Sequence, residues 1–258
     1  MPSSRLCTVV GATLLIASFG LLLAACISVP NTSLSIFTLE ATRREARGST
    51  GPSIVLDFGL WGWCQATAAT WSRYPQGCLR VGGSASYDPA AIIRPMISTG
   101  FFSSIESRKL RDLTLGFPLP AVAAATAGLG FLSALASVAK RNRLTILASA
   151  IFSALSFIFA VSALGCIFSL FEKIRKDVPR STDLRLATNL RVFHDISMRY
   201  GASTWTLVAA CAMLLLSAAV FIFAWLAEAR QTRQKSIDES KEKASYSPSE
   251  GRSSVAGS

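Results

Sequence analysis

Ionisable residues are missing from four long stretches of this 258-residue sequence. Residues 6–29, 113–139, 144–171 and 206–227 contain no Asp, Glu, Lys, Arg or His. Each stretch is longer than the roughly 18 to 20 apolar residues that cross a hydrocarbon core about 30 Å thick. A water-soluble helix of this length needs a polar face, and none of the four has one. We therefore predict four transmembrane helices and an integral membrane protein that contacts the lipid bilayer.

Residue patterns for catalysis or metal binding are also scarce. The one histidine, His194, is followed by Asp195, and neighbours in sequence do not face each other on a helix. Paired carboxylates, a glycine-rich phosphate loop, zinc-ligand spacing and a nucleophile elbow are all missing from the sequence. We therefore predict that the protein is not an enzyme and uses no cofactor or metal. A membrane enzyme that uses His194 is a lesser alternative.

Acidic residues are few, at 15 against 26 basic ones, which gives a formal net charge of +11. The basic residues are spread over the termini and loops without a nucleic-acid recognition motif, so we predict anionic headgroups as their partners and no nucleic acid. The loop 140–143 is short and basic, and the positive-inside rule places it and both termini in the cytoplasm. The third loop, 172–203, opposes this orientation because it carries seven Lys or Arg.

The composition of the apolar runs indicates a packed bundle. Small residues let helix backbones approach closely in a membrane. The second and third runs contain Ala123, Ala127, Gly128, Gly130, Ser149, Ser153, Ala160 and Gly165. Trp205 and Trp225 bracket the fourth run, whose length places both indole rings at headgroup level. We therefore set the spans at about 6–29, 113–139, 144–171 and 205–227, within a membrane domain over residues 1–228.

The six cysteines fall into two groups. Four lie in or at the edge of the spans, where a thiol acts as a small apolar filler: Cys7, Cys26, Cys166 and Cys211. Cys64 and Cys78 lie in the polar loop 30–112 with thirteen residues between them. A disulfide between them would place this loop outside the cytoplasm, whereas two free thiols would place it inside. Both interpretations remain open at this level.

The N-terminal run has a second interpretation. Leu23, Ala24, Ala25 and Cys26 resemble a bacterial lipoprotein cleavage site that follows a basic residue, Arg5. Three later apolar runs and the cysteine pair in the first loop favour a membrane span instead.

The two long loops show different periodicities. After Ser53 the first loop alternates at Ile54, Leu56, Phe58 and Leu60, which predicts a strand and a small sheet. In the third loop, Leu186, Leu190, Phe193 and Tyr200 recur at near-helical spacing, which predicts a helix. The third span is expected to continue as a helix beyond the membrane until Pro179 stops it.

The C-terminal segment 229–258 has almost no apolar residues, and we predict a disordered cytosolic tail. Arg230, Arg233 and Lys235 form a basic cluster where anionic lipid would attract them. Ser247, which precedes Pro248, is a candidate phosphorylation site.

A short motif in the first loop resembles a known family. The loop contains Gly59, Leu60, Trp61, Gly62, Trp63 and Cys64, followed by Cys78. This order resembles the claudin-superfamily signature, which is Gly-Leu-Trp, two further residues, Cys and a second Cys between the first two of four spans. The long first loop, the tiny basic second loop and the serine-rich tail resemble more closely the fungal branch of that superfamily, the Sur-seven/PalI family.

The resemblance implies a mainly α fold, a transmembrane four-helix bundle topped by a small extracellular β-sheet. By the same resemblance, Cys64 and Cys78 form a disulfide that pins the sheet, Trp61 packs against the bundle, and Gly59 and Leu60 complete the motif. The gap of thirteen residues between the cysteines is longer than is usual in vertebrate claudins. Tight-junction function is therefore not inferred.

The family resemblance also implies a function. We predict a non-enzymatic plasma-membrane protein of a fungus that organises cortical membrane domains of the eisosome or actin cortical patch type, with roles in cell-wall integrity and endocytosis. One alternative is a PalI-type component of ambient-pH signalling. Another is a claudin-like channel subunit or calcium-influx regulator. In each case the expected partners are other membrane proteins or further copies of the chain.

Overall fold

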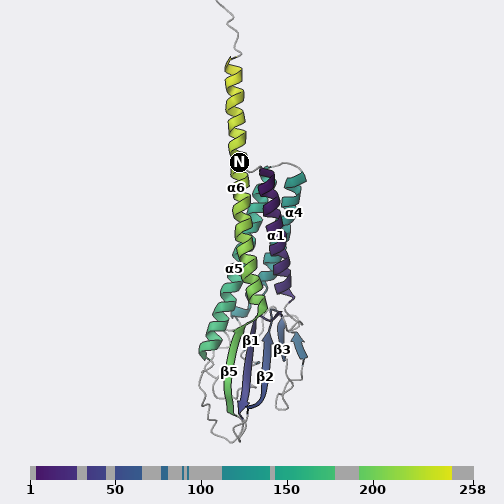
Figure 1. The fold of residues 1–258 in the computed structure, drawn as a ribbon, viewed down its shortest axis with the longest axis vertical. Coiled ribbons are helices and arrows are strands. Elements are labelled where there is room, and N and C mark those ends of the chain that lie inside the picture. Colours follow the sequence, from purple (N-terminus) through teal and green to yellow (C-terminus); the bar gives the residue numbers. More distant parts are fainter. Residues whose placement is uncertain are drawn as a thin grey trace, which may run out of the picture.

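Four long helices stand side by side in a bundle with a β-sheet at one end (Figure 1). The computed structural model describes residues 4–27, 34–44, 50–65, 77–80, 89, 92, 112–139, 143–177 and 192–245. The helices are α1 (Ser4–Cys26), α4 (Leu119–Ala139), α5 (Arg143–Asp177) and α6 (Ala202–Ser245). Within the described residues, four helical segments are long and apolar enough to cross a membrane, which confirms the predicted spans.

The bundle packs through small residues. Ala123, Ala127 and Ala160 are fully buried between helices. A side chain at Gly130 would lie 3.1 Å from Cβ of Phe152 and 3.2 Å from Leu15, so α4 approaches both neighbours closely. Gly165 differs from its predicted role: it lies on an exposed face, where an added Cβ would have no atom within 4 Å.

The sheet combines strands from both long loops. The strands are β1 (Phe37–Arg44), β2 (Thr50–Phe58), β3 (Gly62–Gln65), β4 (Gly77–Arg80) and β5 (Val192–Tyr200). Their order is β4-β3-β2-β1-β5, and every neighbouring pair is antiparallel. The first loop thus supplies four adjacent strands, and the third loop completes the sheet beside β1.

The third loop corrects one prediction. Phe193 and Tyr200 lie on β5 rather than on a helix, while Leu186 and Leu190 lie outside the described residues. Pairing with β1 explains the difference, because a long-range hydrogen-bonded ladder overrides a weak local periodicity. The predicted strand around Leu56 is confirmed as β2, and α5 ends at Asp177, shortly before Pro179, as expected.

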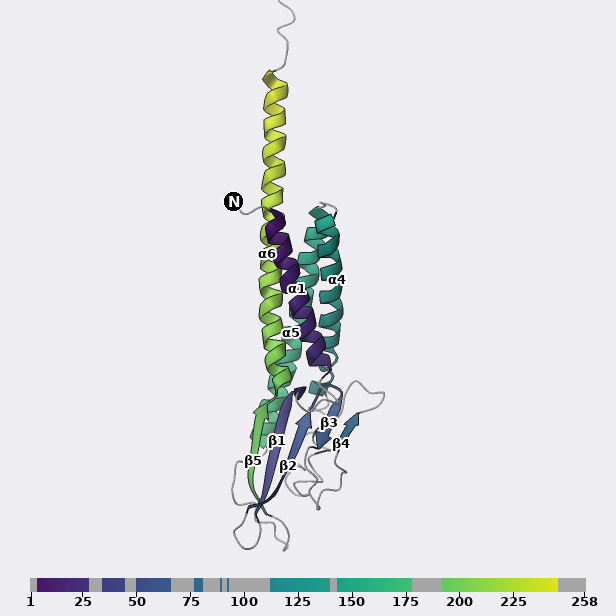
Figure 2. The same cartoon turned by 45° about the vertical axis from the view of Figure 1, so that its right-hand side comes forward.

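One face of the sheet is aromatic. Phe37 of β1 pairs in register with Phe58 of β2 and Tyr200 of β5. The rings of Phe37 and Phe58 stack with centroids 4.5 Å apart, and both side chains are fully buried. Phe171 of α5 stacks on Tyr200 at 3.9 Å. The end of α5 therefore packs against this face of the sheet (Figure 2).

The C-terminal segment also differs from prediction. α6 continues as a helix to Ser245, so residues 229–245 are helical rather than disordered, and residues 246–258 lie outside the described part. Helix propagation is favourable once a helix is nucleated, and the membrane span provides that nucleus. Figure 1 shows this extension projecting beyond the bundle, at the end opposite the sheet.

The arrangement confirms the predicted fold class. Four apolar helices, a small antiparallel sheet and a Cys64–Cys78 disulfide together form a claudin-like fold. The described ends of the chain, the end of α4 and the start of α5 lie at the opposite end of the bundle from the sheet (Figure 2).

Candidate functional site

The family-like motif lies where the sheet meets the bundle. Gly59, Leu60 and Trp61 form the turn between β2 and β3, closed by a hydrogen bond from the Gly59 amide to the Gly62 carbonyl at 2.8 Å. The half-buried indole of Trp61 donates from Nε1 to the carbonyl of Cys26 at 2.8 Å. This carbonyl belongs to the last turn of α1, where carbonyls lack helical partners. Trp61 thereby ties the sheet to the end of α1.

The disulfide lies in a row that crosses the sheet. Cys64 and Cys78 are direct partners on β3 and β4, with Cα atoms 4.0 Å apart. Cys64 also pairs with Asp57 of β2, which pairs with Thr38 of β1. Thr38 donates to the Asp57 carboxylate at 2.7 Å. Burial raises the pKa of Asp57, and the Thr38 hydrogen bond partly opposes this effect.

A second connection joins the sheet to α6. The Gly201 amide donates to the Ile36 carbonyl at 2.7 Å, and Thr204 Oγ1 donates to the same carbonyl at 2.7 Å. The Ser203 amide donates to the Ser35 carbonyl at 3.0 Å. A Cβ atom at Gly201 would lie 2.0 Å from the Ser35 carbonyl oxygen. Only glycine therefore fits at this junction without a backbone shift.

Buried serines join the helices of the bundle. Ser153 of α5 donates to the Leu214 carbonyl of α6 at 3.1 Å, and Ser156 of α5 donates to the Ala123 carbonyl of α4 at 2.7 Å. Ser217 of α6 donates to the Gly11 carbonyl of α1 at 3.0 Å. All three hydroxyls are fully buried. These bonds connect α1, α4, α5 and α6 at membrane depth, where a hydroxyl without a partner is costly.

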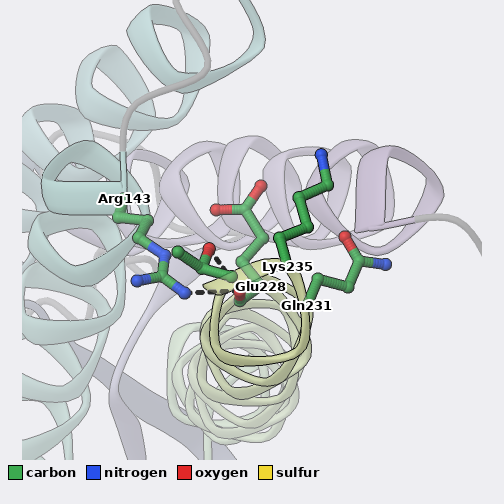
Figure 3. Close-up of a pocket in the computed structure, with 5 residues that line it drawn as sticks. Arg143, Glu228, Gln231 and Lys235 are labelled. Atoms are coloured by element: carbon green, nitrogen blue, oxygen red, sulfur yellow. Dashed lines mark hydrogen bonds between the residues drawn. The ribbon is translucent and has the colours of Figure 1, made fainter. Parts of the chain in front are cut away.

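A cavity of about 280 Å³ opens at the other end of the bundle. It is lined by Arg143 at the start of α5 and by Glu228, Gln231, Thr232 and Lys235 of α6. Arg143 Nη2 donates to the backbone carbonyl of Glu228, and Thr232 Oγ1 donates to the same carbonyl at 3.1 Å (Figure 3). The Glu228 side chain is buried, whereas Lys235 is exposed.

The predicted basic cluster is divided by this geometry. Lys235 lines the cavity, and Arg230 and Arg233 lie on exposed parts of α6 outside its lining. Ser247 lies outside the described residues.

Sequence reasoning missed Arg143 and Glu228 as site residues. The spacing of Glu228, Gln231, Thr232 and Lys235 on one helix face was a signal that could have found part of this lining.

His194 lies on β5, at the edge of the sheet as the structure describes it. The described residues contain no group of three or more His, Cys, Asp or Glu side chains able to hold a metal ion. Four cysteines are free thiols on the helices, namely Cys7, Cys26, Cys166 and Cys211.

Comparison with known proteins gives one positive result. The model of the SUR7/PalI family matches residues 7–227, which run from the first turn of α1 to the end of the last apolar run and include the sheet. No curated protein matches the chain.

Proposed function

The chain belongs to the SUR7/PalI family, and on that premise we propose that it is a non-enzymatic plasma-membrane protein that organises cortical membrane domains in a fungus. In this role it acts as a scaffold of the eisosome or cortical patch type and contributes to cell-wall integrity and endocytosis. Its partners are other membrane proteins or further copies of itself, held together within the bilayer.

The serine bonds between helices carry this proposal. A transporter that moves ions or protons places ionisable groups at membrane depth, whereas the apolar runs of this chain contain none. The buried hydroxyls of Ser153, Ser156 and Ser217 all bond to carbonyls of neighbouring helices. These polar groups hold helices together, which supports a scaffold over a transport pathway.

We propose that the sheet lies outside the cell and both termini lie in the cytoplasm. The disulfide supports this orientation because such bonds persist in oxidising compartments. Arg143, at the α4–α5 connection, and the basic residues Arg230, Arg233 and Lys235 of α6 then all lie on the cytoplasmic side. There they face the anionic lipids of the inner leaflet.

Fluorescence imaging of the full chain in fungal cells tests the proposal. At constant pH we expect the protein in stable cortical patches, and deletion should disturb patch number or wall resistance. An even distribution over the membrane would contradict the scaffold role. Loss of growth only at alkaline pH would favour ambient-pH signalling, and a defect confined to calcium uptake would favour the channel-subunit alternative.

A further inference from the structure

The cavity lies at the end of the bundle opposite the sheet (the tail end), where the apolar runs meet polar sequence. Arg143 is the last ionisable residue before the apolar run of α5, and Glu228 is the first after the apolar run of α6. The hydrogen bond from Arg143 to the Glu228 carbonyl holds these two residues at one level. In a membrane this is the level of the lipid headgroups, because both runs end there.

The lining of the cavity has a defined direction. Glu228, Gln231, Thr232 and Lys235 follow one face of α6, and seven residues of helix rise about 10 Å. The face therefore leads from the membrane boundary at Glu228 outward to Lys235. In the view of Figure 3 the Glu228 carboxylate lies between the Arg143 guanidinium and the Lys235 side chain.

The charges of the lining match one headgroup. Arg143 and Lys235 are cations, Glu228 is an anion, and Gln231 and Thr232 add polar groups. Phosphatidylserine carries the inverse set, a phosphate, a carboxylate and one ammonium group. Phosphatidylglycerol and inorganic phosphate lack the ammonium, and phosphatidylcholine lacks the carboxylate. The volume of about 280 Å³ is below that of pockets for drug-sized ligands, about 300 Å³ and more, and suits a headgroup rather than a whole lipid.

We infer that this cavity binds the headgroup of a phosphatidylserine molecule. The phosphate lies nearest the membrane and bonds to Arg143, whose guanidinium has five N–H donors and can bond to the Glu228 carbonyl and to an anion together. The serine ammonium bonds to the Glu228 carboxylate, which can accept several hydrogen bonds. Lys235, farther from the membrane, pairs with the serine carboxylate.

The inference deepens the proposed function, and rests on it for the leaflet from which the lipid comes. Its test does not depend on the cellular role, because lipid binding is measured on purified protein. A correct lipid site with an even cellular distribution would overturn the scaffold role alone. Cortical patches formed by a protein without lipid selectivity would overturn the headgroup site alone.

The test is native mass spectrometry of the full chain in detergent, titrated separately with short-chain phosphatidylserine and phosphatidylglycerol. We expect phosphatidylserine to bind at least fivefold more tightly. Lys235→Gln should weaken phosphatidylserine binding about fivefold, as expected for the loss of one basic residue at an anionic headgroup. Arg233→Gln is the matched control, because Arg233 is exposed on the same helix outside the cavity, and it should change binding less than twofold.

Glu228→Gln distinguishes the contact with the serine ammonium group from general electrostatic attraction to an anionic lipid. It should remove the preference for phosphatidylserine over phosphatidylglycerol while leaving binding of phosphatidylglycerol intact. Lys235 is exposed, so its variant tests the site even if Glu228→Gln fails to fold. Equal binding of both lipids to the native chain would overturn the inference. A loss of phosphatidylserine binding in Arg233→Gln as large as that in Lys235→Gln would also overturn it. Displacement of the lipid by inorganic phosphate at the same concentration would do the same.

Discussion

The two ends of the bundle are built in opposite ways. At the sheet end, Trp61 bonds to the end of α1, the start of α6 bonds to the Ser35–Ile36 segment, and Phe171 stacks on Tyr200. At the tail end, α6 leaves the bundle as a single helix whose residues 230–241 are exposed. A hydrogen bond from Arg143 of α5 to the Glu228 carbonyl joins α6 to the bundle at that end.

This difference indicates that the two ends of the bundle have different roles. The sheet end is a fixed continuation of the bundle, because strands of the sheet share one buried core with residues of all four helices. The tail end presents charged side chains and a cavity where the apolar runs of α5 and α6 meet polar sequence. We therefore expect substitutions at the sheet end to change stability, and substitutions at the tail end to change binding with little effect on stability.

Loss of the disulfide should have the largest effect on stability. The Cys64–Cys78 bond closes a loop with a sequence separation of 14, and in the chain-entropy model such a loop contributes about 3 kcal/mol. The double variant Cys64→Ser with Cys78→Ser should lower the denaturation midpoint of the sheet, followed by tryptophan fluorescence, while helix content by circular dichroism persists. Cys7→Ala, at a free thiol, is the control. An unchanged midpoint would show that strand pairing alone holds the sheet.

Gly201→Ala should have the next largest effect, a loss of about 2 kcal/mol in the free energy of unfolding, within the range for overpacking. The added Cβ would lie 2.0 Å from the Ser35 carbonyl oxygen, so the backbone must move. Gly165→Ala is the matched control, because nothing lies within 4 Å of its Cβ. Thermal unfolding in detergent measures both variants. Equal melting temperatures for the two would mean that the junction of β5 and α6 is not rigid.

A pH effect at Asp57 should be smaller. Its pKa is raised in the folded state by burial, so the folded protein binds the proton more tightly than the unfolded chain does. Stability contributed by this group therefore falls as pH rises from about 3.8 through the raised pKa, and is constant above it. Asp57→Asn should remove this dependence, measured as the difference between the stability–pH curves of the two proteins. Parallel curves would contradict the burial assigned to Asp57.

Ser240→Pro should have the smallest effect on the bundle. Proline in a helix interior removes a hydrogen bond and clashes with the preceding turn, so about two turns of the exposed helix should be lost. Circular dichroism should report this loss, with Ser240→Ala as control, while the melting temperature stays constant. A lower melting temperature would show that the extension of α6 supports the bundle and would weaken the contrast between the two ends.

The parts of the fold that were predicted from sequence depend on strong local patterns. The four spans follow from uncharged runs, and β2 follows from the alternation around Leu56. β5 was missed because its partner β1 lies about 150 residues earlier in the chain, and pairing at that distance leaves no local pattern. The helix beyond Glu228 was missed because a lack of apolar residues indicates only that the segment buries little surface. This helix continues from the membrane span, which is already helical.

The candidate site was predicted only in part. The motif Gly59, Leu60, Trp61 and Cys64 was visible as a resemblance, but the partner of Trp61, the carbonyl of Cys26, is a backbone group that no motif displays. Lys235 was identified as basic and placed with Arg230 and Arg233. Its cavity was not foreseen, because Arg143 comes from another helix, 85 residues from Glu228.

The central claim is that the sheet end lies outside the cell as a disulfide-bonded unit and the tail end lies in the cytoplasm. Mass mapping of the Cys64 and Cys78 peptides from intact cells, with a membrane-impermeant thiol reagent applied before and after reduction, tests it most directly. We predict a linked peptide pair that takes up the reagent only after reduction, without permeabilisation. Two free thiols that react only after the cells are permeabilised would contradict the claim and reverse the orientation.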